Sequence, residues 1–229
     1  MPSNFSDLIN VPNLETNFIK GIDLSHHNST IKDWNSIRNA GIAFAIIKVS
    51  DGVNSPDKYA SEHATMAQKK GLKIGYYHFA HPDTKSGGNI IADAKAEAND
   101  FMSRLKTLPH SDLDFFLDLE NWGPAPQNDS SLNPVDYLLW ANTFIDELLR
   151  AANEPGKSVV IYSRKEYLDR KLPGNHNLGK YKFWISRYIN DYNKAIAPVG
   201  WNDWYLWQFT ETGAFANNMG TFDLNIMRK

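Results

Sequence analysis

Two carboxylates separated by one residue, Asp118 and Glu120, are the strongest candidates for chemistry in this sequence. They follow the apolar residues Phe115, Phe116 and Leu117, which predicts that the pair ends a buried strand. Alternate residues of a strand share a face, so the two carboxyl groups would point the same way, about 6–7 Å apart at Cβ. Burial and a neighbouring negative charge both raise a carboxyl pKa. One group could then act as an acid while the other stays ionised, as glycoside hydrolysis requires.

The same triplet also occurs in surface turns, so its meaning depends on the elements around it. Short apolar runs rich in β-branched and aromatic residues recur along the chain and suit strands that are buried on both faces. The predicted strands are 19–25, 43–50, 73–80, 114–120, 158–163, 182–188, 204–210 and 221–226. Helix candidates follow the first five. The sequence therefore predicts an α/β fold, an irregular TIM-like barrel of five β/α units followed by three further strands.

The five expected helices are marked by capping residues and by apolar spacing. They are a helix capped by Asp33 and ending at Gly41, one opened by Ser55-Pro56 and closed by Gly71, an amphipathic helix over 91–108, one starting at Asn133-Pro134, and one opened by a capping box of Ser163 and Glu166.

Polar residues at the C-terminal ends of barrel strands point into the active site of this fold. The carboxylates placed there are Asp23 from the first strand, Asp118 and Glu120 from the fourth, and Asp223 from the eighth. Lys48, Tyr77, His78, Tyr162, Trp184, Tyr188 and Gln208 are expected beside them. Four carboxylates from three strands would thus meet at one end of the barrel.

The histidines allow a second interpretation. His26 and His27 follow the first strand, while His78 and His81 end the third, so these residues and nearby carboxylates could hold a metal ion. However, adjacent histidines on an extended segment face opposite ways, and no H-x-H or H-x-x-x-H spacing occurs. Structural or substrate-contacting roles fit better, and we expect neither a metal site nor a cofactor.

Composition limits the partners of the chain. The 229 residues carry a formal net charge of −2, which gives no reason to expect nucleic acid as a partner. No apolar run reaches the ~20 residues of a membrane span, and residues 1–20 do not resemble a signal peptide. The localisation therefore stays open. We expect a monomer with one catalytic domain over 19–229 and an N-terminal flank over 1–18.

Seven motifs, taken together and in order, resemble glycoside hydrolase family 25, the Chalaropsis-type lysozymes. They are G-I-D-L-S-H-H-N (21–28), G-Y-Y-H-F-A (75–80), F-L-D-L-E (116–120), I-Y-S (161–163), F-W-I-S-R-Y (183–188), W-Q-F-T (207–210) and F-D-L-N (222–225). The resemblance covers about residues 20–227. It implies an irregular barrel and cleavage of the β-1,4 bond between N-acetylmuramic acid and N-acetylglucosamine in peptidoglycan.

The resemblance also implies roles for single residues. Glu120 would be the proton donor, Asp118 its partner carboxylate, and Asp23 and Asp223 an acidic floor. The residues expected to line the site are Tyr77, Tyr162, Trp184 and Gln208, with Tyr188 as a further candidate. One departure stands out, because Ser50-Asp51-Gly52 replaces the family's usual Thr-Glu-Gly. Asp51 is one methylene shorter than Glu, which leaves open the polar contact made from that loop.

Three functions remain at this point. In the first, Glu120 protonates the glycosidic oxygen while the sugar's 2-acetamido group attacks with help from Asp118, a substrate-assisted scheme that the resemblance associates with net retention. The second is a metal-dependent deacetylase or amidase acting on the same polymer. The third is an inactive sugar-binding barrel, against which the four intact carboxylates argue.

Overall fold

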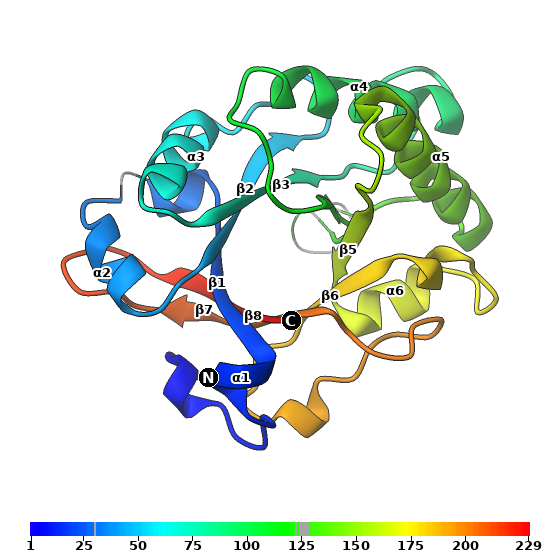
Figure 1. Ribbon diagram of the computed structural model, residues 1–229. Coiled ribbons are helices and arrows are strands. Elements are labelled where there is room, and N and C mark those ends of the chain that lie inside the picture. Colours follow the sequence, from blue (N-terminus) through cyan, green and yellow to red (C-terminus); the bar gives the residue numbers. More distant parts are fainter. Residues whose placement is uncertain (30, 122, 124–128) are drawn as a thin grey trace.

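The computed structural model describes residues 1–29, 31–121, 123 and 129–229. Eight strands close into a barrel in which neighbours in the chain are also neighbours in space (Figure 1). Their bounds are β1 Phe18–Leu24, β2 Phe44–Asp51, β3 Lys73–Phe79, β4 Phe115–Asp118, β5 Val159–Ser163, β6 Lys182–Ser186, β7 Leu206–Gly213 and β8 Phe222–Arg228. Every predicted strand is present, with some ends moved along the chain.

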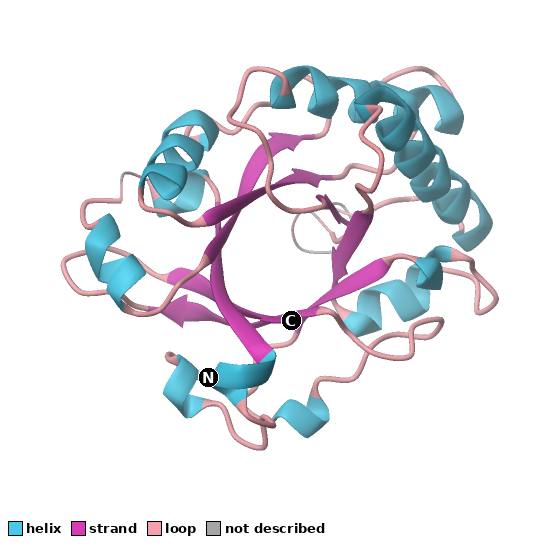
Figure 2. Ribbon diagram, viewed as in Figure 1, coloured by secondary structure: helices cyan, strands magenta, loops and turns pink. Residues whose placement is uncertain are grey.

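Helices follow the first five strands and surround the barrel from the left of the view over the top to the lower right (Figure 2). They are α2 Trp34–Asn39, α3 Ala60–Lys69, α4 Ile90–Leu105, α5 Pro134–Ala152 and α6 Lys165–Lys171. The remaining elements are α1 Leu14–Asn17 and the 3-10 turns η1 Phe5–Asp7, η2 His26–Asn28, η3 Leu178–Lys180 and η4 Tyr192–Lys194. The predicted plan of five β/α units followed by three strands is confirmed.

The last strand runs against its neighbours. β8 pairs antiparallel with both β1 and β7, whereas all other neighbouring strands pair parallel. A parallel crossover needs a dozen or more residues. Only residues 214–221 link β7 to β8, so the chain turns back at the same end of the barrel. This link length determines which residues of β8 reach the site.

The strands bury both faces, which explains their continuous apolar runs. Phe44 and Ile46 of β2 belong to a cluster inside the barrel, whereas Ala45 and Ile47 belong to the layer between barrel and helices. This alternation follows from the pleat of a strand. A Cβ at Gly21 of β1 would lie 2.1 Å from the Phe44 ring, so glycine is needed there for the ring to fill the barrel.

Helix starts agree with the prediction where an Asx cap opens the helix. Asp33 accepts hydrogen bonds from two backbone N–H groups of α2, and Asn133 does the same for α5. The predicted start at Ser55-Pro56 is wrong, because Pro56 bridges to Ser50 and α3 begins only at Ala60.

The predicted capping box of Ser163 and Glu166 is also wrong. The Ser163 Oγ donates to the Leu119 carbonyl instead, across 2.5 Å, because Ser163 is still part of β5. The N-cap residue of α6 is Arg164, which makes no side-chain cap.

The N-terminal residues lie against β7, where the barrel has no covering helix (Figure 1). Phe5 is buried, and its ring meets that of Phe209 edge-on at 5.3 Å. Ile9 forms a parallel bridge with Asp191 after β6. Residues 1–10 thus cover apolar surface that helices cover elsewhere in the fold. No helix in the described part of the chain has the length and apolar character to cross a membrane.

Candidate active site

The strands β1 to β7 end at one opening of the barrel, which we call the mouth. Asp23 lies near the end of β1, and Asp118 ends β4. The pairing of β1 with β8 sets Asp223 directly opposite Asp23. Burial, followed by the charge of another member of the group, raises the pKa of Asp118 and of Asp223. The structure therefore gathers the predicted carboxylates, with Glu120, into one electrostatically coupled cluster.

Asp223 reaches the mouth in a different way from the one expected. The sequence analysis placed it at the C-terminal end of its strand, but it is the second residue of β8. Because β8 is antiparallel to β1, its first residues lie where β1 ends. The residue is placed at the mouth as predicted, while the reason given for it was wrong.

Glu120 lies just beyond β4 rather than within it. Asp118 is the last residue paired with β3 and β5, and Glu120 sits in the bend that follows. The intervening Leu119 is anchored by its backbone N–H, which donates to the Tyr162 carbonyl across 3.0 Å. Burial raises the pKa of Glu120 to about 7, although the positive charges of Arg164 and Lys48 act in the opposite direction. Glu120 can therefore hold a proton near neutral pH.

Asp118 carries an unused hydrogen-bond acceptor. Its residue surface is only 5% exposed, and its Oδ1 atom has no hydrogen-bond partner among the described residues. Burial, followed by the charge of Glu120, raises the pKa of Asp118 well above its ordinary value, whereas Lys48 opposes this shift. An unsatisfied buried acceptor is costly, so Asp118 Oδ1 is available to a donor that a ligand brings.

Two amides hold Asp23 in place. Asn225 Nδ2 and Gln208 Nε2 both donate to Asp23 Oδ2, across 2.7 and 2.9 Å. Burial raises the pKa of Asp23, and these two donors act against it. Burial, followed by the charge of Asp23, raises the pKa of Asp223 well above its ordinary value. The two amide donors thus favour the ionised form of Asp23, against the effect of burial.

Two tyrosines determine the orientation of the Gln208 amide. Tyr162 and Tyr188 donate their hydroxyl protons to Gln208 Oε1, across 2.9 and 3.1 Å. The amide nitrogen is then left to face Asp23. Asp23 is thus held by a hydrogen-bonded group of three other residues predicted for the site, Tyr162, Tyr188 and Gln208.

Tyr77 and Trp184 lie deeper than expected. Both belong to the cluster inside the barrel, with Phe116 and Tyr162, and Trp184 is 2% exposed. Its ring meets that of Tyr162 at 4.6 Å. The expectation that the Trp184 ring lines a groove disagrees with this burial, because the large aromatic residues near strand ends also have to fill the barrel.

Lys48 supplies a positive charge near Asp118 and Glu120. Its Nζ donates to Asp51 Oδ2 across 2.5 Å and lies 4.4 Å from the centre of the Phe79 ring. The other oxygen of Asp51 meets His81 Nε2 at 2.6 Å. Although burial acts to raise it, the hydrogen bonds from His81 and Lys48 hold the pKa of Asp51 below its ordinary value. Although Asp51 is shorter than the Glu usual in the family, its carboxylate makes two polar contacts, with Lys48 and His81.

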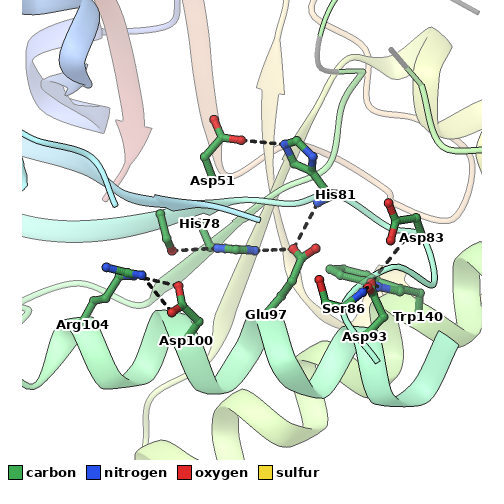
Figure 3. A network of polar contacts seen from close by, with 11 residues as sticks. Asp51, His78, His81, Asp83, Ser86, Asp93, Glu97, Asp100, Arg104 and Trp140 are labelled. Carbon is green, nitrogen blue, oxygen red and sulfur yellow. Dashed lines mark hydrogen bonds and ion pairs between the residues drawn. The ribbon is translucent and has the colours of Figure 1, made fainter. Parts of the chain in front are cut away.

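His78 does not reach the mouth, which corrects the prediction. Glu97 of α4 accepts a hydrogen bond from His78 Nε2 at 2.7 Å and another from the His81 backbone N–H at 3.1 Å (Figure 3). The other ring nitrogen of His78 meets Ser50 Oγ at 2.8 Å. His78 and Glu97 are fully buried between barrel and helix. This network fixes α4 to β3 and the loop that carries His81.

His26 is also paired locally. His26 Nδ1 meets Asp57 Oδ2 at 3.0 Å. In the part of the chain that the structure describes, no three His, Cys, Asp or Glu side chains form a group that could hold a metal ion.

Sequence reasoning missed two residues of the site, Asn225 and Arg164. Asn225 was part of the F-D-L-N motif but received no role, since its contact with Asp23 depends on the direction of β8. Arg164 follows β5 directly, and its charge acts on Glu120. Its position after a strand end, beside the acid pair, was the available signal.

Comparison with known proteins adds a separate line of evidence. Residues 22–218 match the family described as Glycosyl hydrolases family 25. The chain belongs to this family. The resemblance found in the sequence is therefore confirmed, and the protein is a glycoside hydrolase.

One similar protein is Lysozyme M1 of Streptomyces globisporus, which is 31% identical over 214 residues; the match covers 92% of this chain and 68% of that protein. The N,O-diacetylmuramidase of Chalaropsis sp is 24% identical over 219 residues, and the match covers 92% of this chain and 98% of that protein. Among solved structures, the bacterial lysozyme from Streptomyces coelicolor matches with a TM-score of 0.75 at 26% identity, with 92% of each chain covered. The family match begins at residue 22, so the N-terminal segment lies outside it.

Proposed function

We propose that this family 25 glycoside hydrolase is a lysozyme that cleaves the β-1,4 bond between N-acetylmuramic acid and N-acetylglucosamine in peptidoglycan. The observation that carries the proposal is the pair at the end of β4. Glu120 has a pKa of about 7, and the neighbouring Asp118 is buried with one oxygen unpartnered. The named relatives, a lysozyme and a muramidase, support this substrate.

Glu120 acts as the general acid in this scheme. A carboxyl group with a pKa near the working pH is suited to proton transfer, because it is protonated in a large share of molecules and still gives up its proton. Glu120 is half-buried, whereas Asp118 is buried. The more accessible member of the pair is thus the one assigned to the leaving oxygen.

Asp118 receives the 2-acetamido group of the sugar. Its free Oδ1 accepts the amide N–H, which favours the ionised form of Asp118 and leaves the proton of the coupled pair on Glu120. Hydrogen bonding to the amide also increases the negative charge on the acetamido carbonyl oxygen, which is the attacking atom.

The reaction then proceeds in two displacements. In the first, Glu120 transfers its proton to the glycosidic oxygen, the C–O bond breaks, and the acetamido oxygen bonds to the anomeric carbon from the opposite face. In the second, Glu120 accepts a proton from water. The water oxygen attacks the same carbon and breaks its bond to the acetamido oxygen, which opens the five-membered ring formed in the first step. Two inversions give net retention. Asp23 and Asp223 lie opposite one another at the mouth, and negative charge on this pair stabilises the positive charge that develops on the sugar.

The test is mass analysis of fragments released from purified peptidoglycan. Muramic acid at the new reducing ends supports the proposal. Glucosamine at that position assigns the enzyme to the other glycosidic bond, and a digest without glycan scission refutes the function.

A further inference from the structure

The N-terminal segment is built into the rim of the mouth. The carbonyl of Pro2 accepts hydrogen bonds from the hydroxyls of Thr210 and Thr212, which lie in β7 beyond Gln208. The Ile9 backbone N–H donates to the Asn190 carbonyl across 2.8 Å, and Asn10 Nδ2 donates to Asp191 Oδ1 across 2.9 Å. Segments from opposite ends of the chain are thus joined next to the site.

A hollow lies between this segment and the residues that follow β6. It has a volume of about 550 Å³ and is lined by Met1, Pro2, Asp7, Tyr188, Ile189 and Asn190. This volume is within the range of ~300–1,000 Å³ that is typical of sites for small ligands. Half of the lining therefore comes from residues that precede the family match.

One side chain connects the hollow to the carboxylates of the mouth by hydrogen bonds. Tyr188 lines the hollow, and its hydroxyl donates to Gln208, which in turn donates to Asp23. A ligand in contact with the Tyr188 ring therefore lies next to the residues that support the carboxylates.

A second hollow lies across the mouth. It has a volume of about 250 Å³, and its lining includes Lys48 and Asp51 of β2. In a closed barrel of eight strands β2 and β6 are opposite one another. A linear polymer that enters at β2 and crosses the carboxylates leaves at β6, where the first hollow lies.

We propose that the hollow between the N-terminal segment and Tyr188–Asn190 is a distal subsite that binds one sugar residue of the glycan strand outside the bond that is cleaved. This inference rests on the proposed lysozyme function. A tyrosine ring beside a carboxylate and a carboxamide suits a sugar, which offers an apolar ring face together with hydroxyl and acetamido groups. The occupant is the glycan itself, because the strand is continuous through the site.

The experiment uses Asn190→Trp, which fills the hollow but keeps the backbone carbonyl that Ile9 requires. The matched control is Asn175→Trp, at another exposed asparagine, which lies before β6 and so at the far end of the barrel. Both variants and the unaltered protein are assayed on long glycan strands that retain stem peptides, on the same strands freed of them, and on a tetrasaccharide of the same sugars. Melting temperatures verify that both variants fold.

We expect Asn190→Trp to lower kcat/KM on long strands by about tenfold, equivalent to the loss of roughly one good contact. Its rate on the tetrasaccharide, and all rates of Asn175→Trp, should stay within twofold of the unaltered protein. Asn190→Ala should give a smaller loss in the same direction, on long strands alone.

Three results overturn the subsite. They are equal rates for Asn190→Trp and Asn175→Trp on long strands, an equal loss on both substrates, and a loss seen only when stem peptides are retained, which would assign the hollow to peptide. If the unaltered protein cleaves neither glycan, the proposed function itself fails.

Discussion

Trp184 Nε1 donates a hydrogen bond to Asn225 Oδ1 across 2.8 Å inside the barrel. An indole N–H can only donate, so the Asn225 oxygen must face Trp184 and its nitrogen must face Asp23. The ring that fills the barrel therefore also determines how the amide above it presents its protons. Core packing and the charge of the site are coupled through this contact.

Replacement of Trp184 by Ala should destabilise the fold. Removal of a buried tryptophan costs about 3–5 kcal/mol of unfolding free energy, and urea denaturation followed by circular dichroism measures it. Trp184→Phe keeps most of the apolar volume but leaves the Asn225 oxygen without its donor, so it should lower activity more than stability. An unchanged melting temperature with a raised KM for Trp184→Ala would place the ring on the substrate surface instead.

Glu120→Gln should abolish turnover while the fold and glycan binding are kept. The amide has the same shape but no transferable proton, a contribution of ~10²–10⁴ in rate. Initial rates on peptidoglycan and binding to insoluble cell wall measure the two effects. Activity within tenfold of the unaltered protein would assign the acid role to another group.

Activity should fall as the pH rises through about 7, the pKa of Glu120, because the acid form is then lost. Arg164 lowers this pKa, so Arg164→Gln should move the alkaline limb of the kcat/KM profile to higher pH. Arg170→Gln is the matched control, since that side chain pairs with Asp129. A limb that stays in place in Arg164→Gln would show that a different group controls it.

Glycan whose muramic acid sugars carry free amines should resist the enzyme. The amine lacks the carbonyl oxygen that attacks the anomeric carbon, so Asp118 Oδ1 no longer has an amide to polarise. Cell wall is compared before and after N-deacetylation, with chemical re-acetylation as the control for damage. Ready cleavage of the deacetylated wall, or a covalent sugar adduct on Asp118, would replace substrate assistance by direct attack.

Exhaustive dialysis against EDTA should leave the rate unchanged. Within the described residues no cluster of potential ligands is suited to a metal ion, and Asp23 is occupied by amide donors. The measurement is the rate before and after dialysis, together with metal analysis of the dialysed protein. Loss of activity that zinc restores would favour a metal-dependent hydrolase.

The strands and the acid pair could be predicted because their signals are local. Apolar runs are visible in the sequence, and Asp118 and Glu120 directly follow one of them. The role of Asn225 is not local, because it depends on which way β8 runs relative to β1. His78 shows the same limit. Successive residues of β3 face opposite sides of the barrel wall, and a shift of one position separates the mouth from the layer under α4.

The antiparallel course of β8 also sets the order in which the site can be assembled during synthesis. Asp23 and its amide donor Asn225 are separated by 202 positions, and the barrel has no closed wall until β8 fills the gap between β1 and β7. A nascent chain that ends after β7 already contains Glu120 and Asp118 but lacks Asp223 and Asn225. We therefore expect unfinished or truncated chains to be inert, so that bond-cleaving activity arises only once the final strand has docked.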